Sequence, residues 1–276
     1  MTSNRNVELF AIGNELLVGQ VQDTNSHWII RNITSTGAKV VRAAMLRDEI
    51  KTIGDEIKAA VRRKPRLILT TGGLGPTDDD LTVRAISQAF NLPLSEDPIA
   101  LEMVRARYAY IASIRENYSA ELNEARRKMA LMPAGAIPLK NPNGAAPAVA
   151  LALGETVLVL LPGVPSEMKE IFASSLQPIL ERTIGAGGYV ERNMVLDRGD
   201  ESRIADVLQT VQARHSAVYI KSRGQILAQY GQRLTVVLSC GGNDLSAARA
   251  QVHETEVELL DGLHGLGYAI LDVLDS

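Results

Sequence analysis

The order of apolar and polar segments along residues 1–183 predicts a parallel α/β sheet. Short apolar runs predict strands, and the expected strands span residues 7–12, 40–46, 66–71, 137–139, 148–153 and 157–161. Segment 48–61 carries apolar residues at the 3.6-residue spacing of an amphipathic helix. Further helices are expected over residues 81–90 and from Asp23 or Thr24, either of which can cap the helix. Strands that alternate with helices are typical of a parallel sheet covered on both faces.

Residues 97–129 of the same domain are expected to form two helices, and one further helix should run from Pro165 to about residue 183.

The segments after residue 185 predict a second, smaller domain. Gly185-Ala186-Gly187-Gly188 is the best linker candidate. After it the pattern predicts a βαββαβ order, with strands at 190–196, 217–222, 234–240 and 268–274 and helices at 200–212 and 244–264. We therefore expect a nucleotide-binding type of domain over residues 1–185 and a small α+β domain over residues 189–276.

Composition narrows the class of protein. The chain has 276 residues, of which 46% are hydrophobic and 22% charged, and its net charge is -3. This is the balance of a globular protein, without the basic excess that marks nucleic-acid binding. No apolar run reaches the roughly 20 residues of a membrane span, and no signal peptide is expected. The single cysteine, Cys240, excludes an internal disulfide. We expect a cytoplasmic protein without nucleic-acid or membrane partners.

The segment TTGGLGPTDDD, residues 70–80, is the strongest candidate for a site. It joins an apolar strand to a helix and contains three glycines, Gly72, Gly73 and Gly75, and three consecutive aspartates, Asp78, Asp79 and Asp80. Glycines permit close backbone approach to a ligand, a helix start offers N–H groups to an anion, and carboxylates are ligands for Mg²⁺. In the alternative interpretation the glycines relieve backbone strain and the aspartates cap the helix. One aspartate suffices for a cap, and three adjacent ones repel each other.

Three further loops follow predicted strands. Gly13–Gln20 adds one carboxylate, Glu15. Asn141–Ala148 consists of small residues with amide groups that can bond phosphate, ribose or a ring edge, although it can equally be an ordinary connection. Asp48 opens a helix and can be only its N-cap. Because ligands sit at the carboxyl ends of parallel strands, loops in these places are expected to face one site.

Four motifs in order resemble the CinA family of competence/damage-inducible proteins. They are GNELLVGQ with DTN at residues 13–25, TGGLGPTDDDLT at 71–82, NPNGAAPA at 141–148 and LPGVPSEM at 161–168. The N-terminal domain of that family has the molybdopterin-binding fold shared with MoaB, MogA and MoeA. The resemblance covers residues 7–183 and implies a three-layer α/β/α sandwich, followed by a small KH-like domain. It also implies a metal-dependent pyrophosphatase acting on ADP-ribose-like nucleotides, and self-association.

The resemblance also assigns roles to residues and shows two departures. Asp80 and Thr82 match the motif of the molybdopterin proteins, and Asp48 matches their second acidic position. Ser166 and Glu167 match the LPGVPSEM corner. The family usually has Asp where this chain has Asn14, which removes one potential metal ligand or base. The chain ends at Ser276, before the C-terminal amidase domain of full bacterial members, so deamidation is not expected.

Three functions are therefore under consideration. The first is hydrolysis of ADP-ribose to AMP and ribose 5-phosphate with Mg²⁺, Mn²⁺ or Co²⁺. Its expected catalytic residues are Asp80, Asp48 and Asp79, and its expected metal ligands are Asp78, Asp79 and Asp80. The expected substrate-binding residues are Gly13, Asn14, Glu15, Asn25, Gly72, Gly73, Gly75, Thr82, Asn141, Gly144, Pro162, Gly163, Ser166 and Glu167. The second function is pterin binding or adenylyl transfer in molybdenum cofactor synthesis. The third is non-catalytic nucleotide binding. A homo-oligomer is expected, a dimer rather than a trimer.

Overall fold

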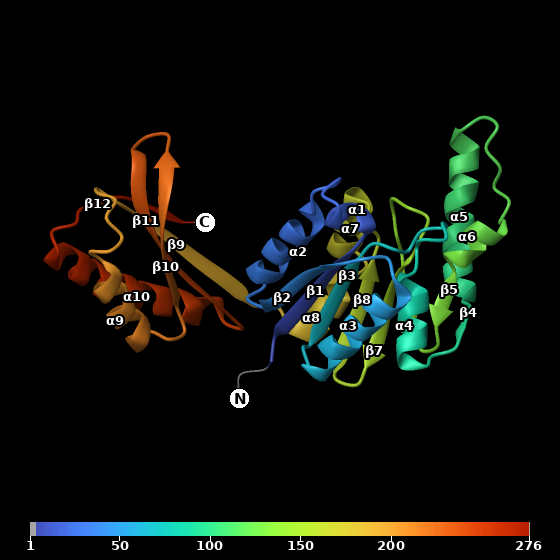
Figure 1. Ribbon diagram of the computed structural model, residues 1–276, viewed down its shortest axis with the longest axis horizontal. Helices are drawn as coiled ribbons and strands as arrows, with labels where there is room; N and C mark the ends of the chain where they lie inside the picture. The colour runs from blue at the N-terminus through green and yellow to red at the C-terminus, as the bar shows by residue number, and fades with distance from the viewer. Residues whose placement is uncertain (1–3, 276) are drawn as a thin grey trace. The chain divides into compact units, whose positions relative to one another are not determined.

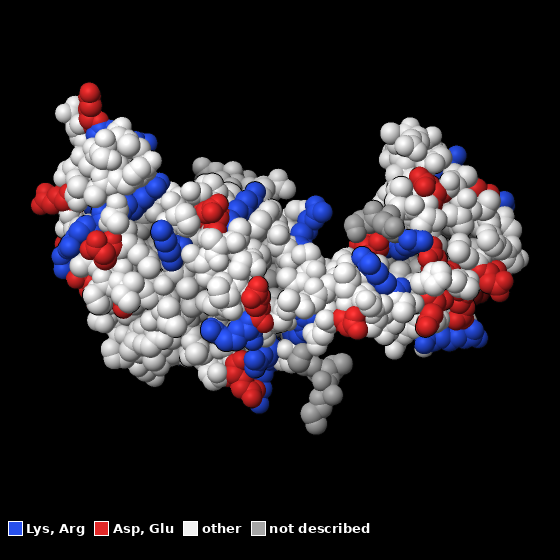
Figure 2. Space-filling view, turned by 180° about the vertical axis from the view of Figure 1, so that it is seen from behind, with Lys and Arg blue, Asp and Glu red and all other residues white. Residues whose placement is uncertain are grey.

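The computed structural model describes residues 4–275 (Figure 1). Their contacts divide the chain into two compact units, one of Met1–Asn32 with Lys39–Gly185 and one of Ile33–Ala38 with Ala186–Ser276. On the face that Figure 2 shows, acidic and basic side chains are interspersed rather than gathered by sign. No helix within the described range combines the length and apolar character needed to cross a membrane.

The first unit is built on a six-stranded mixed sheet. The spatial order is β2-β1-β3-β8-β7-β6. The parallel strands are β1 (Asn6–Ile12), β2 (Lys39–Leu46), β3 (Leu67–Thr71) and β8 (Thr156–Leu161). The antiparallel strands β7 (Ala148–Leu153) and β6 (Ile137–Leu139) complete it, and β7 forms the expected hairpin with β8 through Gly154 and Glu155. The prediction of a parallel α/β sheet is confirmed for β1, β2, β3 and β8, and β7 and β6 add an antiparallel edge.

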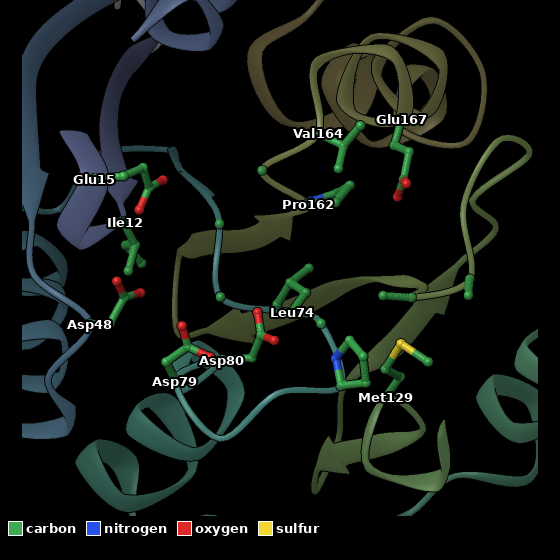
Figure 3. A pocket seen from close by; sticks show the side chains of 18 of the residues that line it. Ile12, Glu15, Asp48, Leu74, Asp79, Asp80, Met129, Pro162, Val164 and Glu167 are labelled. Carbon is green, nitrogen blue, oxygen red and sulfur yellow. The ribbon is translucent and has the colours of Figure 1, made fainter. Parts of the chain in front are cut away.

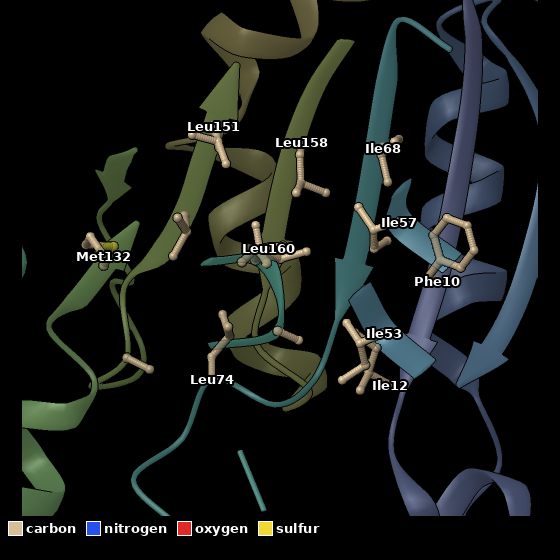
Figure 4. Close-up of a cluster of buried hydrophobic side chains, with 14 of the residues drawn as sticks. Phe10, Ile12, Ile53, Ile57, Ile68, Leu74, Met132, Leu151, Leu158 and Leu160 are labelled. Atoms are coloured by element: carbon tan, nitrogen blue, oxygen red, sulfur yellow. The ribbon is translucent and has the colours of Figure 1, made fainter. Parts of the chain in front are cut away.

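Helices cover both faces of this sheet. On one face α3 (Ile50–Arg62) and α4 (Thr82–Phe90) pack on alternate strand residues, and Figure 4 shows Ile57 beside Phe10 and Ile68, and Ile53 beside Ile12. Successive residues of a strand point to opposite faces of the sheet. The buried residues Leu9 of β1 and Leu69 of β3 therefore face the helix layer on the other side. That layer contains α2 (Thr24–Ser35), where the Asp23 carboxylate caps the helix by accepting from the Ser26 N–H.

One predicted helix is two helices. We predicted a single helix from Pro165 to about residue 183, whereas α7 (Pro165–Ala173) ends before α8 (Gln177–Ile184) begins. Pro178 explains the break, because it has no N–H to donate to the carbonyl one turn earlier and its ring clashes with that carbonyl. In the loop after β1, a four-residue helix that was not predicted, α1 (Asn14–Leu17), precedes the turn.

The segment between α4 and β6 forms an arm. It contains α5 (Pro98–Ile114), capped by Asp97, and α6 (Glu124–Lys128), capped by Asn123. The prediction of two helices over 97–129 is confirmed. Two strands of three residues each, β4 (Leu94–Glu96) and β5 (Leu131–Pro133), pair at the base of the arm and were not predicted. The equally short β6 was predicted from its apolar run, whereas β4 contains the polar Ser95 and Glu96 and offers no such run, and β5 forms its strand by pairing with β4.

The second unit is an antiparallel four-stranded sheet with two helices. Its elements are β9 (Gly188–Leu196), α9 (Ala205–Arg214), β10 (Tyr219–Leu227), β11 (Gly231–Gly242), α10 (Leu245–Gly265) and β12 (Ile270–Asp275). The predicted βαββαβ order is confirmed, with spatial order β10-β11-β9-β12. The β10–β11 hairpin extends beyond the predicted strands, over residues 223–227 of β10 and 231–233 of β11. Backbone hydrogen bonds pair this extension, in which Ile226 is exposed rather than buried in the core.

Candidate ligand-binding site

A cleft lies at the carboxyl ends of the parallel strands. The chain leaves β1 at Gly13, β2 close to Asp48, β3 at Gly72 and β8 at Pro162, and all four residues line this cleft. Its volume is about 410 Å³, within the usual range for sites of small ligands. The lining consists of Ile12, Gly13, Glu15, Asp48, Gly72, Gly73, Leu74, Gly75, Pro76, Asp79, Asp80, Tyr108, Met129, Ala145, Ala146, Pro162, Gly163, Val164 and Glu167 (Figure 3).

The glycine loop brings three strand ends together. Gly72 has φ 102° and donates its N–H to the Leu161 carbonyl at 3.0 Å. A Cβ at this position would lie 2.0 Å from the carbonyl oxygen of Ile12, so only glycine fits. The buried Thr82 hydroxyl donates to the Gly72 carbonyl at 2.9 Å. The protein's own packing thus accounts for this glycine, and the same backbone also lines the cleft.

The three consecutive aspartates face different surroundings. The Thr77 hydroxyl lies 2.5 Å from Asp79 Oδ1 and 2.6 Å from Asp80 Oδ2, and the Thr77 N–H donates to Asp80 Oδ2 at 2.9 Å. The Thr77 hydrogen bond also lowers the pKa of Asp79. Asp78 does not line the cleft and instead lines a separate depression with Arg84 and Lys128. The N-cap of α4 is Leu81, without a side-chain hydrogen bond, so the alternative that the aspartates cap this helix is wrong.

Asp48 joins two of the cleft loops. The N-cap of α3 is Glu49, so the interpretation of Asp48 as that cap is also wrong. Its carboxylate instead accepts the backbone N–H of Asn14 at 2.7 Å. Burial raises the pKa of Asp48, the Asn14 hydrogen bond opposes this shift, and the nearby negative charges of Glu15, Asp79 and Asp80 add to it. The carboxylates of the three loops are therefore close enough to interact electrostatically.

Two asparagines, Asn141 and Asn25, hold the part of the cleft lining that contains Glu167 and Gly163. The Asn141 amide donates to Glu167 Oε2 at 2.7 Å and to the Ala146 carbonyl at 2.9 Å, so it fixes both the 141–146 loop and the Glu167 carboxylate. The buried Asn25 amide donates to the Gly163 carbonyl at 2.7 Å. Within the described residues, its Oδ1 has no hydrogen-bond partner. Both asparagines therefore position residues that line the cleft.

The predicted site residues separate into lining and supporting groups. Those that line the cleft are Gly13, Glu15, Asp48, Gly72, Gly73, Gly75, Asp79, Asp80, Pro162, Gly163 and Glu167. Those outside the lining are Asn14, Asn25, Asp78, Thr82, Asn141, Gly144 and Ser166. Sequence reasoning missed Ile12, Leu74, Pro76, Tyr108, Met129, Ala145, Ala146 and Val164 as lining residues. Tyr108 lies in the segment 97–129, for which we predicted only helices, and no local pattern marks it as part of a site.

The cleft is strongly acidic. Five carboxylates line it, those of Glu15, Asp48, Asp79, Asp80 and Glu167, and the described lining residues include no lysine, arginine or histidine. Among residues 4–275, no group of three or more His, Cys, Asp or Glu side chains is arranged to hold a metal ion. Mg²⁺ is usually bound through one or two carboxylates together with water and ligand phosphate, rather than by an all-protein cage. The oxygen donors present therefore fit a cation that is held jointly with a ligand.

Fold and cleft define an α/β protein with a small-molecule site at the carboxyl edge of its sheet. The family described as probable molybdopterin binding domain matches residues 8–182, and the chain belongs to that family. A protein of Aeropyrum pernix is 35% identical over 263 residues, which is 95% of each chain. A protein of Pyrobaculum arsenaticum is 38% identical over 215 residues, 78% of each chain.

A solved structure confirms the resemblance to CinA. The crystal structure of CinA from Thermoplasma acidophilum, described as a protein with unknown function, is 33% identical. The match covers 65% of this chain and 98% of the CinA chain, with a TM-score of 0.57. The expected family and fold class are thereby confirmed.

Proposed function

We propose that the cleft binds a phosphorylated pterin of the molybdopterin class together with a divalent cation. The observation that carries the proposal is the chemistry of the cleft, which has four carboxylates and a glycine backbone on one side and apolar side chains with the single carboxylate of Glu167 on the other. A ligand with a charged phosphate and a planar ring matches both sides. Membership of the probable molybdopterin binding family supports the pterin as that ring.

The negative charge of the cleft is the reason for proposing a divalent cation. A phosphate that approaches Glu15, Asp48, Asp79 and Asp80 meets only negative side chains, and this repulsion is costly in a partly desolvated cleft. Mg²⁺, Mn²⁺ or Co²⁺ supplies the compensating charge and prefers oxygen donors such as carboxylate and phosphate. Asp79 and Asp80 are the proposed metal ligands because Thr77 holds both on the cleft side. Asp78 is left out because it lies outside the cleft lining.

Calorimetry with molybdopterin and ADP-ribose, each with and without Mg²⁺, tests the proposal. We expect molybdopterin to bind more tightly than ADP-ribose and to lose at least about 10-fold in affinity when Mg²⁺ is removed. Asp80→Asn should reduce the Mg²⁺ dependence, whereas Asp55→Asn on the exposed side of α3 should not. Failure of wild-type protein to bind molybdopterin in the presence of Mg²⁺ would reject pterin binding.

A second candidate is hydrolysis of a nucleotide pyrophosphate, and one observation favours it. Asp48 is half-buried beside other carboxylates, and burial raises its pKa, which is the property of a carboxylate that accepts a proton from water. In this reaction Asp48 takes a proton from the attacking water. A new oxygen–phosphorus bond forms and the bond from phosphorus to the bridging oxygen breaks. The products of ADP-ribose are AMP and ribose 5-phosphate, and a bound cation would neutralise charge on the phosphates.

Product analysis separates this activity from binding alone. Incubation of ADP-ribose with the protein and Mg²⁺, Mn²⁺ or Co²⁺ should yield AMP, and Asp48→Asn should slow the reaction at least about 100-fold. ADP-ribose that stays intact with every metal, while molybdopterin binds, would eliminate the hydrolase and leave the pterin site in place.

A further inference from the structure

The cleft has two chemically different ends. In Figure 3, Glu15, Asp48 and Asp79 lie on one side, and Met129 and Glu167 lie on the other. Tyr108, Ala145 and Ala146 also line the cleft. Aromatic and apolar surfaces of this kind accommodate planar rings. Arg107, the neighbour of Tyr108, donates to the carbonyls of Pro142 and Asn143, in the same loop as the Asn141 that binds Glu167.

Tyr108 comes from the arm and is held in a fixed orientation. The guanidinium carbon of Arg126 lies 3.8 Å from the centre of the Tyr108 ring and 5.3 Å from that of Tyr118. The two rings are nearly parallel, with centres 6.3 Å apart. Arg126 also donates to the carbonyls of Ser119 and Glu121, both at 2.7 Å. One side chain of α6 thus ties α5 to the 115–123 segment and fixes the Tyr108 ring that borders the cleft.

Glu167 is held with spare acceptor capacity. Asn141 is the one hydrogen-bond partner of its carboxylate within residues 4–275. Asn141 Oδ1 in turn accepts the Gly144 N–H at 2.8 Å. A Cβ on Gly144 would lie 1.9 Å from Glu167 Oε2, so the glycine gives this carboxylate its space. An ionised carboxylate has about four lone-pair positions, and Glu167 therefore has acceptors left for a ligand.

We infer that this end of the cleft is a subsite for a planar ring that presents two adjacent N–H donors. Pterin and guanine share such an edge, a ring N–H beside an amino group, and Glu167 accepts both hydrogens while Tyr108 contacts the ring. Adenine presents an acceptor nitrogen beside its amino group, and that lone pair would face the carboxylate. Tyr108 and Glu167 are thus the specificity-determining residues, and Arg126 is a positioning residue for Tyr108. This inference rests on the proposed function and names the ring that the site selects.

A ligand panel tests the subsite. Calorimetry in Mg²⁺ should compare a pterin monophosphate, GMP, AMP and inorganic pyrophosphate. We expect GMP and the pterin to bind at least about 10-fold more tightly than AMP, as bidentate edge recognition allows. The tighter of the two identifies the natural ring. Glu167→Gln should abolish the preference over AMP, because an amide offers one acceptor and one donor. Glu170→Gln, on the same helix but outside the cleft lining, is the matched control.

Variants of Tyr108 test the proposed contact between its side chain and the ligand ring. Tyr108→Ala should weaken every ring-bearing ligand by about 5-fold to 150-fold, as loss of stacking on a base does, and should leave pyrophosphate unaffected. Tyr108→Phe should restore the affinity. Equal binding of AMP and GMP by the wild-type protein, or a preference that survives in Glu167→Gln, would overturn the inference. Binding of pyrophosphate without any ring-bearing ligand would overturn it while leaving the phosphate site intact. Binding of none of the ligands would remove the proposed function as well.

Discussion

The carboxylate of Asp48 accepts the backbone N–H of Asn14 at 2.7 Å, across 34 positions of sequence. This bond connects the loops that follow β1 and β2. It uses the backbone of residue 14, whose side-chain Oδ1 accepts from Arg47 at 3.5 Å and does not line the cleft. The departure from the family's usual aspartate at this position therefore leaves the contact with Asp48 in place.

Removal of the Asp48 charge should stabilise the fold at neutral pH. Its folded-state pKa is raised, so the contribution of Asp48 to stability is present below its unfolded pKa, near 4, and is lost as the pH rises through the folded value. Asp48→Asn, which can still accept from Asn14, should raise the Tm at pH 7 by a few degrees. This gain should vanish near pH 3. Scanning calorimetry across pH measures it.

The matched control is Asp55→Asn on α3. The hydrogen bond from Lys51 lowers the pKa of Asp55, so its contribution has the opposite sign, present above the unfolded pKa and lost as the pH falls. A gain in Tm at pH 7 from both variants alike would show that the effect is not specific to the cleft.

Loss of the Thr77 hydroxyl should loosen both cleft aspartates. Thr77→Val removes the O–H that lies within hydrogen-bond distance of Asp79 and Asp80 and keeps the shape of the side chain. Because the Thr77 hydrogen bond lowers the pKa of Asp79, that pKa should rise towards its ordinary value. We expect Mg²⁺-dependent ligand affinity to fall about 10-fold to 100-fold, because a hydrogen bond to a charged group contributes about 1.5–3 kcal/mol. Thr77→Ser should restore it, and the idea does not survive if Thr77→Val binds like the wild type.

A methyl group at position 144 should displace Glu167. Because a Cβ there would meet both Glu167 Oε2 and the Asn141 amide, Gly144→Ala forces one of them to move. We expect weaker binding of ring-bearing ligands in calorimetry and unchanged binding of pyrophosphate. Gly265→Ala, where nothing lies within 4 Å of the added Cβ, controls for the substitution itself.

The ion pair between Glu8 and Arg63 should be important for stability. Glu8 is 2% exposed, and the Arg63 Nε donates to its Oε1 at 2.8 Å from the end of α3. Arg63→Met would leave a buried carboxylate without its partner, at a cost of about 3–5 kcal/mol in the free energy of unfolding. Urea unfolding measures this, and the Glu8→Met, Arg63→Met double variant should recover most of the loss. A change below about 1 kcal/mol would contradict this account.

Much of the architecture follows from local patterns. The apolar runs of β1, β3 and β8 and the 3.6-residue period of α3 are properties of neighbouring residues, so the sequence predicts these elements. The short strands β4 and β5 and the break at Pro178 were missed, the strands because they depend on pairing with each other across the arm. The cleft loops at Gly13, Gly72 and Pro162 could be placed together because parallel strands present their carboxyl ends at one edge.

The sequence by itself determined the order of elements, the βαββαβ second unit and the presence of a glycine and aspartate loop at the edge of the sheet. Only the tertiary structure decided which side chains of that loop face the cleft, since the direction of Asp78, Asp79 and Asp80 depends on backbone angles within one turn. It also brought Tyr108 from the arm to the cleft and set Asn141 against Glu167. These contacts join residues that are distant along the chain, and packing rather than local periodicity creates them.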